Sequence, residues 1–306
     1  TLLSGAFLIF DFAIPASPGE VMKITDIKTL IVNAQMRNWI FVKLTTDEGI
    51  EGIGENYNTV RDKATEASVH QFGHWLMGKD PRDIELHWQA MYRCPRFPLG
   101  TVDMGALSGL EHALWDILGK SLGVPVWRLL GGRCRDKIKV YTHAGGKTPE
   151  ELAENVQTVV KEGYRAVKIG PQPPNFNLLG ANALVRESEA RVKAVRETVG
   201  EDVDIALDVH GILYNASTAV KLAQALEPYK PLFLEEPFLY ENVGPLLELK
   251  VHTSIPIATG ERLFTRYGFR ELLEKRAVDI IQPDPCVCGG ILESKRIAAM
   301  ADAYYV

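Results

Sequence analysis

The sequence has few cysteines, no long apolar run and no strong excess of charge. Its four cysteines show no paired spacing, which argues against a disulfide framework and favours reduced thiols in a cytoplasmic protein; they are Cys94, Cys134, Cys286 and Cys288. No run reaches the roughly 18 apolar residues of a membrane span. The net charge of −5 supplies no positive field for nucleic acid or an anionic membrane. A small-molecule partner is therefore favoured.

The first 21 residues lack the features of an ordinary N-terminus. They do not begin with Met, they carry Asp11 inside an apolar run, and they have no basic segment. A degraded signal peptide is one alternative. We expect instead a non-native or disordered leader over residues 1–21, with the native chain beginning at Met22, where strand-like alternation starts.

Residues 22–136 are predicted to form a small α+β capping domain. Runs rich in β-branched residues predict three strands, over 22–34, 38–49 and 50–57. The Asp47-Glu48-Gly49 segment between the second and third predicts a hairpin turn. Helical periodicity follows over about 60–78, 83–93 and 102–122, and Gly123 is expected to end the last helix.

Residues 137–306 alternate short apolar strands with amphipathic helices. The strand-like runs are 138–143, 165–170, 203–209, 231–236, 255–259 and 278–283. They recur at the spacing of βα units, and no Gly-x-Gly-x-x-Gly turn follows any of them, so an α/β fold with a (β/α) TIM-like barrel is favoured over an open doubly wound sheet. Residues 303–306 are expected to begin a seventh strand. The barrel is therefore expected to be C-terminally truncated, with roughly six units plus the start of strand 7.

Three acids stand at the ends of three successive predicted strands. Asp208, Glu235 and Glu261 are 27 and 26 residues apart, which is one βα unit each. They should lie side by side on the rim where barrel enzymes carry their active sites. Carboxylates so close repel one another unless a cation is present, and oxygen ligands select a hard ion such as Mg²⁺. The alternative is that each acid is only a helix cap or a salt-bridge partner.

Two further residues extend this rim. His210 lies two positions after Asp208, on the same side of an extended segment, and histidine is suited to acid or base catalysis near neutral pH. Asp284 ends the sixth predicted strand. An aspartate there could orient a histidine from the seventh strand. That histidine would lie beyond Val306.

Four motifs carry a family resemblance. LDVHG, FLEEP, IATGERLF and IIQPD, in this order after the α+β unit, resemble the mandelate racemase subgroup of the enolase superfamily. The resemblance runs from Met22 to Val306. Within the subgroup, the segments NWIFVKLTTDEGIEGIGE, ALWDILGKSLGVPVWRLLGG and PIATGERLFTR are most similar to those of galactonate dehydratases.

The resemblance implies a Mg²⁺-dependent carbon–oxygen lyase that dehydrates an aldonate, D-galactonate or a close relative. The α-proton would leave through a metal-stabilised enediolate, and loss of the 3-hydroxyl would give a 2-keto-3-deoxy acid. By matching positions, Asp208, Glu235 and Glu261 are the ligands and His210 is the general acid. Asp284 is the partner of the seventh-strand histidine base.

Lys168 separates this reaction from its rivals. Racemases of the subgroup carry Lys-x-Lys at the end of the second strand; here Lys168 matches the first lysine and Gly170 stands in place of the second. Epimerisation or cycloisomerisation, which needs a second base, is therefore disfavoured. A non-catalytic sugar-acid-binding protein is a further alternative, although all three ligands and His210 are intact. Lys168 itself either polarises the substrate carboxylate or is a solvated rim lysine.

Other residues are weaker candidates. His143, at the end of the first barrel strand, could line the pocket, and the 171–185 loop could cover the mouth. Substrate specificity is expected to depend on the capping domain near Arg37 and the 93–100 loop, although each of its arginines, Arg37, Arg93 and Arg96, is more simply a surface residue. Cys286 and Cys288 are expected to be neutral thiols rather than a metal site. The full-length protein is expected to be a homo-oligomer.

Overall fold

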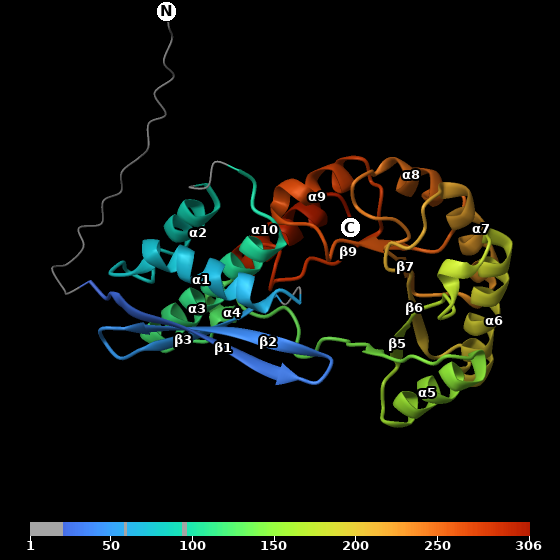
Figure 1. The fold of residues 1–306 in the computed structure, drawn as a ribbon, viewed down its shortest axis with the longest axis horizontal. Helices are drawn as coiled ribbons and strands as arrows, with labels where there is room; N and C mark the ends of the chain where they lie inside the picture. The colour runs from blue at the N-terminus through green and yellow to red at the C-terminus, as the bar shows by residue number, and fades with distance from the viewer. Residues whose placement is uncertain (1–20, 58–59, 94–96) are drawn as a thin grey trace, which may run out of the picture.

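The computed structural model describes residues 21–57, 60–93 and 97–306, and it consists of a capping unit beside a curved wall of strands and helices (Figure 1). Apart from Val21, the predicted leader of residues 1–21 lies outside the described residues. The division between domains at 136 and 137 stays a prediction, since it falls in the irregular segment between the two units. None of the described helices has the length and apolar character needed to cross a membrane.

The capping unit begins with an antiparallel sheet of β1 (Ile24–Ala34), β2 (Arg37–Thr46) and β3 (Glu51–Asn56), in that order. Along β2, alternate side chains Ile40, Val42 and Leu44 are fully buried, as the period of two in a half-buried strand requires. Their face packs on the helices α1 (Asp62–Leu76), α2 (Ile84–Arg93), α3 (Thr101–Leu122) and α4 (Val126–Leu129). The three predicted strands, the hairpin turn and the three predicted helices are confirmed.

Helix α3 is the centre of the capping core. Leu107, Leu110 and Leu114 are fully buried, and Gly123 ends the helix with φ of 66°. The helix lies very close to β3: a Cβ at Gly54 would come within 1.8 Å of the Gly109 carbonyl oxygen. Only glycine allows this approach.

The curved wall is a parallel sheet with the strand order β4-β5-β6-β7-β8-β9. The strands are β4 (Thr142–His143), β5 (Ala166–Ile169), β6 (Asp204–Asp208), β7 (Phe233–Glu235), β8 (Ile257–Thr259) and β9 (Ile280–Ile281). Its helices are α5 (Pro149–Lys161), α6 (Ala181–Val199), α7 (Ala216–Leu226), α8 (Gly244–Lys250), α9 (Thr265–Glu274) and α10 (Gly290–Ala303), with 3₁₀ turns at Phe176–Leu178 and Glu227–Tyr229. The six predicted strands are confirmed, although each is shorter than its apolar run.

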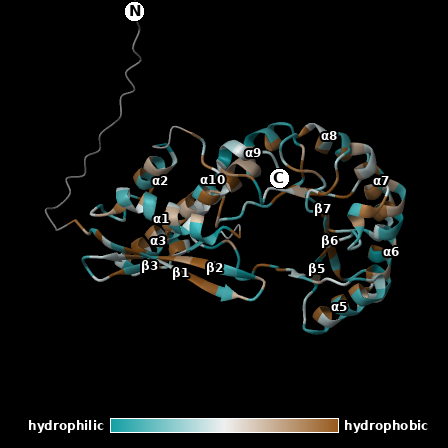
Figure 2. Cartoon of the chain, in the orientation of Figure 1, coloured by the Kyte–Doolittle hydropathy of each residue, from teal (hydrophilic) through white to brown (hydrophobic). Residues whose placement is uncertain are grey.

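The helices cover the outer face of the wall, and hydrophobic and hydrophilic residues alternate along them (Figures 1 and 2). Ile205, Leu207 and Leu234 point to these helices and are fully buried. Ala206 and Phe233 belong to a separate apolar cluster on the inner face. Strand alternation therefore turns Asp208 and Glu235 inward, since each follows these inner residues by two positions.

The seventh strand predicted at 303–306 is wrong. Ala303 ends α10, and Tyr304 and Tyr305 form a turn in which the backbone N–H of Val306 donates to the Ala301 carbonyl oxygen at 3.1 Å. The short run follows a helix directly, and the helical hydrogen bonds continue into it because no loop intervenes. The described sheet is accordingly an open part of a barrel.

The capping unit forms hydrogen bonds with the start of α10. Glu111 of α3 is fully buried, and it accepts hydrogen bonds from the backbone N–H groups of Ile291 and Leu292 at 2.8 and 2.9 Å. The indole N–H of Trp88 donates to the Gly289 carbonyl oxygen at 2.8 Å. These contacts hold the loop that follows β9, and with it Asp284, against the cap.

Candidate metal centre and active site

The three predicted ligands come from neighbouring strands of the wall. Asp208 is paired in register with Glu235, and each is the last residue of its strand. Glu261 lies two residues after Thr259, the end of β8, beyond a sharp bend at Gly260 with φ of 140°. The predicted strand-end positions of Asp208 and Glu235 are confirmed, and Glu261 lies just beyond the end of its strand; the role of all three as ligands stays a prediction.

Lys168 stands between two of these acids. Its Nζ lies 2.7 Å from Glu235 Oε1 and 3.1 Å from Asp208 Oδ2, and the residue is only 6% exposed. The alternative of a solvated rim lysine is therefore wrong. Burial by itself lowers the pKa of Lys168, but the hydrogen bond that Lys168 donates to Glu235 and the charge of Asp208 outweigh burial and raise this pKa above its usual value. Lys168 stays protonated and supplies positive charge to the inner face.

The carboxylate oxygens differ in how well they are satisfied. Glu235 accepts from Lys168 at one oxygen and from Gln282 Nε2, at 3.0 Å, at the other. Asp208 Oδ1 is buried without a hydrogen-bond partner within the described residues. A buried carboxylate oxygen with no donor is costly, and a cation is one group that can satisfy it. The oxygen-only donor set of the three acids fits a hard divalent ion.

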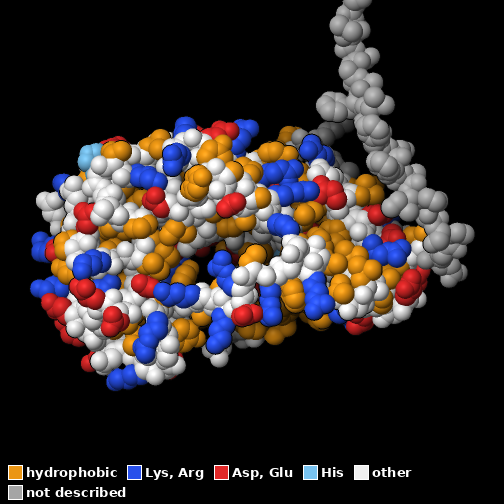
Figure 3. Space-filling view, turned by 180° about the vertical axis from the view of Figure 1, so that it is seen from behind, with side chains coloured by type: hydrophobic (Ala, Val, Ile, Leu, Met, Phe, Trp, Pro, Cys, Tyr) orange, Lys and Arg blue, Asp and Glu red, His pale blue; other side chains and the backbone are white. Residues whose placement is uncertain are grey.

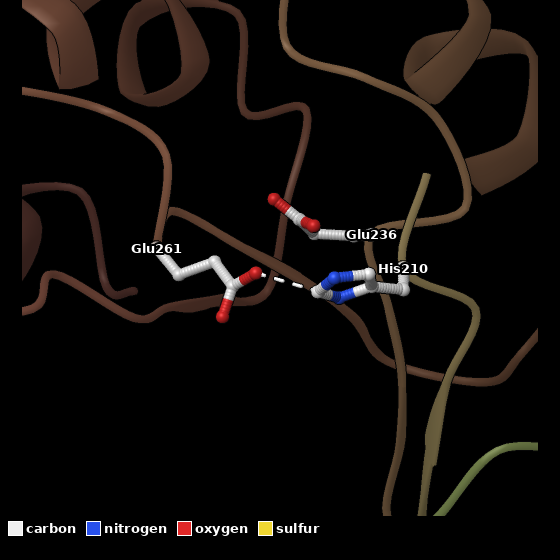
Figure 4. A group of neighbouring side chains, drawn as sticks. All are labelled: His210, Glu236 and Glu261. Carbon is white, nitrogen blue, oxygen red and sulfur yellow. Dashed lines mark ion pairs between the residues drawn. The ribbon is translucent and has the colours of Figure 1, made fainter. Parts of the chain in front are cut away.

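His210 points into the same space from the loop after β6. Its Nδ1 lies 3.5 Å from Glu261 Oε1 and 3.8 Å from Asp208 Oδ1, and more than half of its side chain is exposed. Figure 4 shows the imidazole directed at Glu261, with the Glu236 carboxylate beside both. The backbone of His210 has φ of 56°, a conformation that is rare for a residue other than glycine and that is often found at functional sites.

Glu236 is a site residue that the sequence did not single out. Within the described ranges, the three acid or histidine side chains whose ligand atoms all lie within 4.8 Å of one another are His210, Glu236 and Glu261, and not the predicted trio. Glu236 is 1% exposed and is paired with Arg262, whose Nε lies 2.8 and 3.1 Å from its two oxygens. The only signal in the sequence was its position directly after Glu235, since nothing local indicates the long-range partner.

Asp284 lies near this group, in the loop after β9. Its Oδ1 accepts from the Cys286 backbone N–H at 2.8 Å. Burial raises the pKa of Asp284, the Cys286 hydrogen bonds lower it, and the charge of Glu261 raises it further, so that the net shift is upward. Burial raises the pKa of both Cys286 and Cys288 to about 12. This direction supports neutral thiols at both positions, and their exclusion as a metal site stays a prediction.

A cavity of about 910 Å³ opens between the cap and the wall. It is lined by Met36, Arg37, Tyr57, Val60, Thr101, Leu239, Tyr240, Glu241, Glu261, Arg262 and Phe264. Seen from behind, the surface is hollowed near the middle of the molecule, with lysine and arginine side chains beside the hollow (Figure 3). The volume suits a small-molecule site that both units build.

Tyr57 is a capping residue in this cavity that sequence reasoning missed. Burial raises its pKa, and the charges of Glu261 and Asp284 raise it further. The phenol therefore keeps its proton at neutral pH and can donate a hydrogen bond. Its backbone N–H donates to the Cys286 carbonyl oxygen at 3.1 Å, which ties the cap to the loop after β9.

The weaker candidates have separate outcomes. Arg37 is exposed and also lines the cavity, whereas Arg93 is an exposed residue that donates to Gln89 at 2.6 Å, as a surface arginine would. Arg96 lies outside the described residues, as does Cys94. His143 is exposed and is paired in register with Lys168.

The predicted 171–185 loop is shorter than expected, because α6 begins at Ala181. Its residues Phe176 and Leu179 line a second cavity of about 290 Å³ together with Ile212 and Leu213, which closely follow His210. The loop therefore lies beside the segment that carries the candidate acid.

Comparison with known proteins agrees with this architecture. Residues 19–131 match the mandelate racemase/muconate lactonizing enzyme N-terminal domain, and residues 151–306 match the enolase C-terminal domain-like family. The chain belongs to the enolase superfamily. Members of this superfamily are enzymes that bind a divalent metal.

Curated relatives cover most of this enolase-superfamily chain. It is 44% identical to the D-galactonate dehydratase of Variovorax paradoxus and 41% identical to that of Cronobacter sakazakii, in each case over 93% of this chain and 73% of the relative.

Solved structures of the superfamily share the fold. An enolase from Agrobacterium radiobacter bound to sodium and L-malate has a TM-score of 0.88 and 37% identity, over 93% of this chain and 72% of that one. A superfamily member from Salmonella Typhimurium has a TM-score of 0.86 and 32% identity, over 93% and 79%. This likeness extends to both the cap and the wall, since nearly the whole chain is covered.

Proposed function

We propose that this member of the enolase superfamily is a Mg²⁺-dependent sugar-acid dehydratase that converts D-galactonate or a close aldonate to a 2-keto-3-deoxy acid. The observation that carries the proposal is the inner rim, where Asp208 and Glu235 flank a buried Lys168 and His210 faces Glu261. The relatives named D-galactonate dehydratase support the choice of substrate.

Asp208, Glu235 and Glu261 are the proposed ligands of Mg²⁺. When bound, the metal would offset the negative charge that develops on the substrate carboxylate as the α-proton leaves. Lys168 is proposed to add a second positive charge beside that carboxylate, and because it stays protonated it is not a base.

His210 is the proposed general acid. It would donate a proton to the 3-hydroxyl as the C3–O bond breaks, so that the hydroxyl leaves as water and the remaining enol becomes the ketone. Asp284 is proposed to orient the base that removes the α-proton, a histidine that the family resemblance implies. Gly170 lacks the side chain of a second base on the opposite face, so dehydration is favoured over epimerisation. An active enzyme with its ligand set intact is likewise favoured over a non-catalytic sugar-acid-binding protein.

The location, the class of ligand and the oligomeric state are also proposed. A cytoplasmic location is supported by unpaired thiols, of which Cys286 and Cys288 stay protonated. A small-molecule sugar acid, rather than nucleic acid or a membrane, is supported by the mildly acidic composition. A homo-oligomer is proposed as well.

The test is turnover of a library of aldonates and aldarates with Mg²⁺, followed by detection of 2-keto-3-deoxy products. We expect D-galactonate to be among the substrates and His210→Asn to lower kcat by roughly 10²- to 10⁴-fold, the usual contribution of a general acid. Mg²⁺ affinity, measured by calorimetry, should stay within a few-fold of the wild-type value. His252→Asn, an exposed histidine after α8, is the control and should leave kcat unchanged. Undiminished turnover by His210→Asn would remove that residue from the mechanism.

A further inference from the structure

The ion pair between Glu236 and Arg262 connects two loops that carry proposed metal ligands. Glu236 directly follows Glu235, and Arg262 directly follows Glu261. The Nε–H of Arg262 donates to both carboxylate oxygens of Glu236, at 2.8 and 3.1 Å. This one pair of side chains therefore links the segment that carries Glu261 to the segment that carries Glu235.

The backbone alone leaves Glu261 weakly fixed relative to β7. The ladder between β7 and β8 ends with the hydrogen bond from the Glu236 N–H to the Ala258 carbonyl oxygen, at 2.9 Å. Glu261 comes three residues later, after the bend at Gly260, and within the described residues no backbone hydrogen bond joins it to β7. Beyond the end of the ladder, the Glu236–Arg262 side-chain pair connects the two segments.

The Glu236 half of the pair is fixed by burial and by its backbone contacts, while Arg262 is about one-third exposed (32%). Glu236 is 1% exposed, so its carboxylate must stay paired, and its backbone has φ of 40°. The Glu236 carbonyl oxygen also accepts from the Gly211 N–H at 2.7 Å, next to His210. A planar guanidinium can hold both carboxylate oxygens in a fixed direction, whereas an ammonium acts as a point charge.

We propose that Arg262 and Glu236 are positioning residues that set the separation of the metal ligands Glu235 and Glu261. The inference rests on the proposed metal site. The pair acts through the adjacent ligands, and neither side chain is assigned as a ligand. The cost of disturbing such a partner is typically a 10- to 100-fold loss of metal affinity.

The experiment measures Mn²⁺ binding by electron paramagnetic resonance and Mg²⁺ binding by calorimetry on the purified protein. We expect Arg262→Lys and Glu236→Gln each to weaken binding by roughly 10- to 100-fold. The double variant Glu236→Gln/Arg262→Lys should bind metal about as weakly as the single variant with the lower affinity, because both changes break the same connection.

A matched control separates positioning from general stability. Arg266 and Glu293 form another arginine–glutamate pair, at 2.5 Å, with Glu293 fully buried, but they join α9 to α10, and within the described residues neither side chain pairs with a proposed ligand. Arg266→Lys should lower the melting temperature without changing the Kd for Mn²⁺. Wild-type metal affinity in Arg262→Lys would overturn the proposal. The proposal would also be overturned if the losses of metal affinity in the two single variants added up in the double variant and Glu236→Gln had the larger loss. Glu236 would then be a ligand itself.

These outcomes are distinct from failure of the proposed function. If Mn²⁺ binds and Arg262→Lys weakens it while no sugar acid is turned over, the positioning role stands and the dehydratase function fails. If turnover is found and metal affinity does not depend on Arg262, the positioning role fails alone. A wild-type protein that binds no divalent metal would overturn both.

Discussion

At the scale of single residues, the site is a balance of buried charges. Glu235 is 1% exposed and Lys168 is 6% exposed, so neither would be buried without the other. A metal at this rim would add positive charge to acids that one lysine already compensates in part. The net charge at this rim should therefore differ between the metal-free and the metal-bound protein more than any other property.

Lys168→Met should expose this balance. Without its ammonium, Glu235 becomes a buried acid with one amide donor, and the free energy of unfolding should fall by about 3–5 kcal/mol in metal-free buffer. Mg²⁺ should restore part of the loss, so the rise in melting temperature with Mg²⁺ should be larger than in the wild type. Denaturant titration with and without Mg²⁺ measures both effects. Lys139→Met, which removes an exposed partner of Asp204, is the control and should change stability by less than about 1 kcal/mol.

The residues of this site show what a sequence can and cannot predict. Asp208, Glu235 and Glu261 could be placed at strand ends because strand spacing is a local property. The partner of Glu236 could not, because Arg262 lies 26 residues away and nothing in either segment indicates which of two adjacent acids it contacts. Whether Lys168 was solvated or buried also depended on the tertiary structure.

At the scale of elements, the junction between α3 and α10 combines burial with helix capping. Glu111 accepts from two backbone N–H groups at the start of α10 and from the Trp115 indole N–H at 2.7 Å. Burial nevertheless raises the pKa of Glu111 from 4.5 to about 7; these hydrogen bonds lower it, and the charge of Glu293 raises it. The junction thus holds an acid whose ionisation is costly.

This junction should make stability depend on pH. Because the folded state binds the Glu111 proton more tightly than the unfolded chain, this stabilisation is complete below about pH 4.5 and is lost as pH rises through about 7. The stability difference between wild type and Glu111→Gln should therefore change by roughly 2–3 kcal/mol across that window. Denaturant unfolding at several pH values measures it. Glu274→Gln, an exposed acid at the end of α9, should show no such change, and a flat difference for Glu111→Gln would contradict the assignment.

Element boundaries were the least predictable feature of the fold. The hydrophobic period located every barrel strand, but β4 forms only at Thr142–His143, and Val140 before it is 63% exposed. The seventh strand failed for a related reason. An apolar run is compatible with a helix end as well as with a strand, and the hydrogen bonds of α10 decide between them.

At the scale of the whole molecule, the candidate site belongs to neither unit alone. The cavity is lined by Arg37 and Tyr57 of the cap and by Glu261 and Arg262 of the wall. The sequence could predict both units and their order, since each has its own hydrophobic pattern. Their relative placement depends on contacts between distant residues, such as Glu111 with α10, which no local pattern reports.

Tyr57→Phe tests whether the cap takes part in substrate binding. The phenol keeps its proton and faces acids of the wall, so it is available as a donor to a hydroxyl or carboxylate of a bound sugar acid. Loss of one such hydrogen bond should raise KM for the substrate by roughly 3- to 10-fold, with kcat changed less than KM. Steady-state kinetics on D-galactonate, or on whichever aldonate is turned over, measures the split.

The control for this prediction is Tyr92→Phe, a capping tyrosine that stacks on Trp88 with ring centroids 4.8 Å apart and does not line the cavity. It should leave both constants unchanged. A fall in kcat without a change in KM for Tyr57→Phe would contradict a binding role. Because Tyr57 is also tied to the loop of Asp284 through its backbone, which the substitution preserves, such a result would place the phenol in the chemical step.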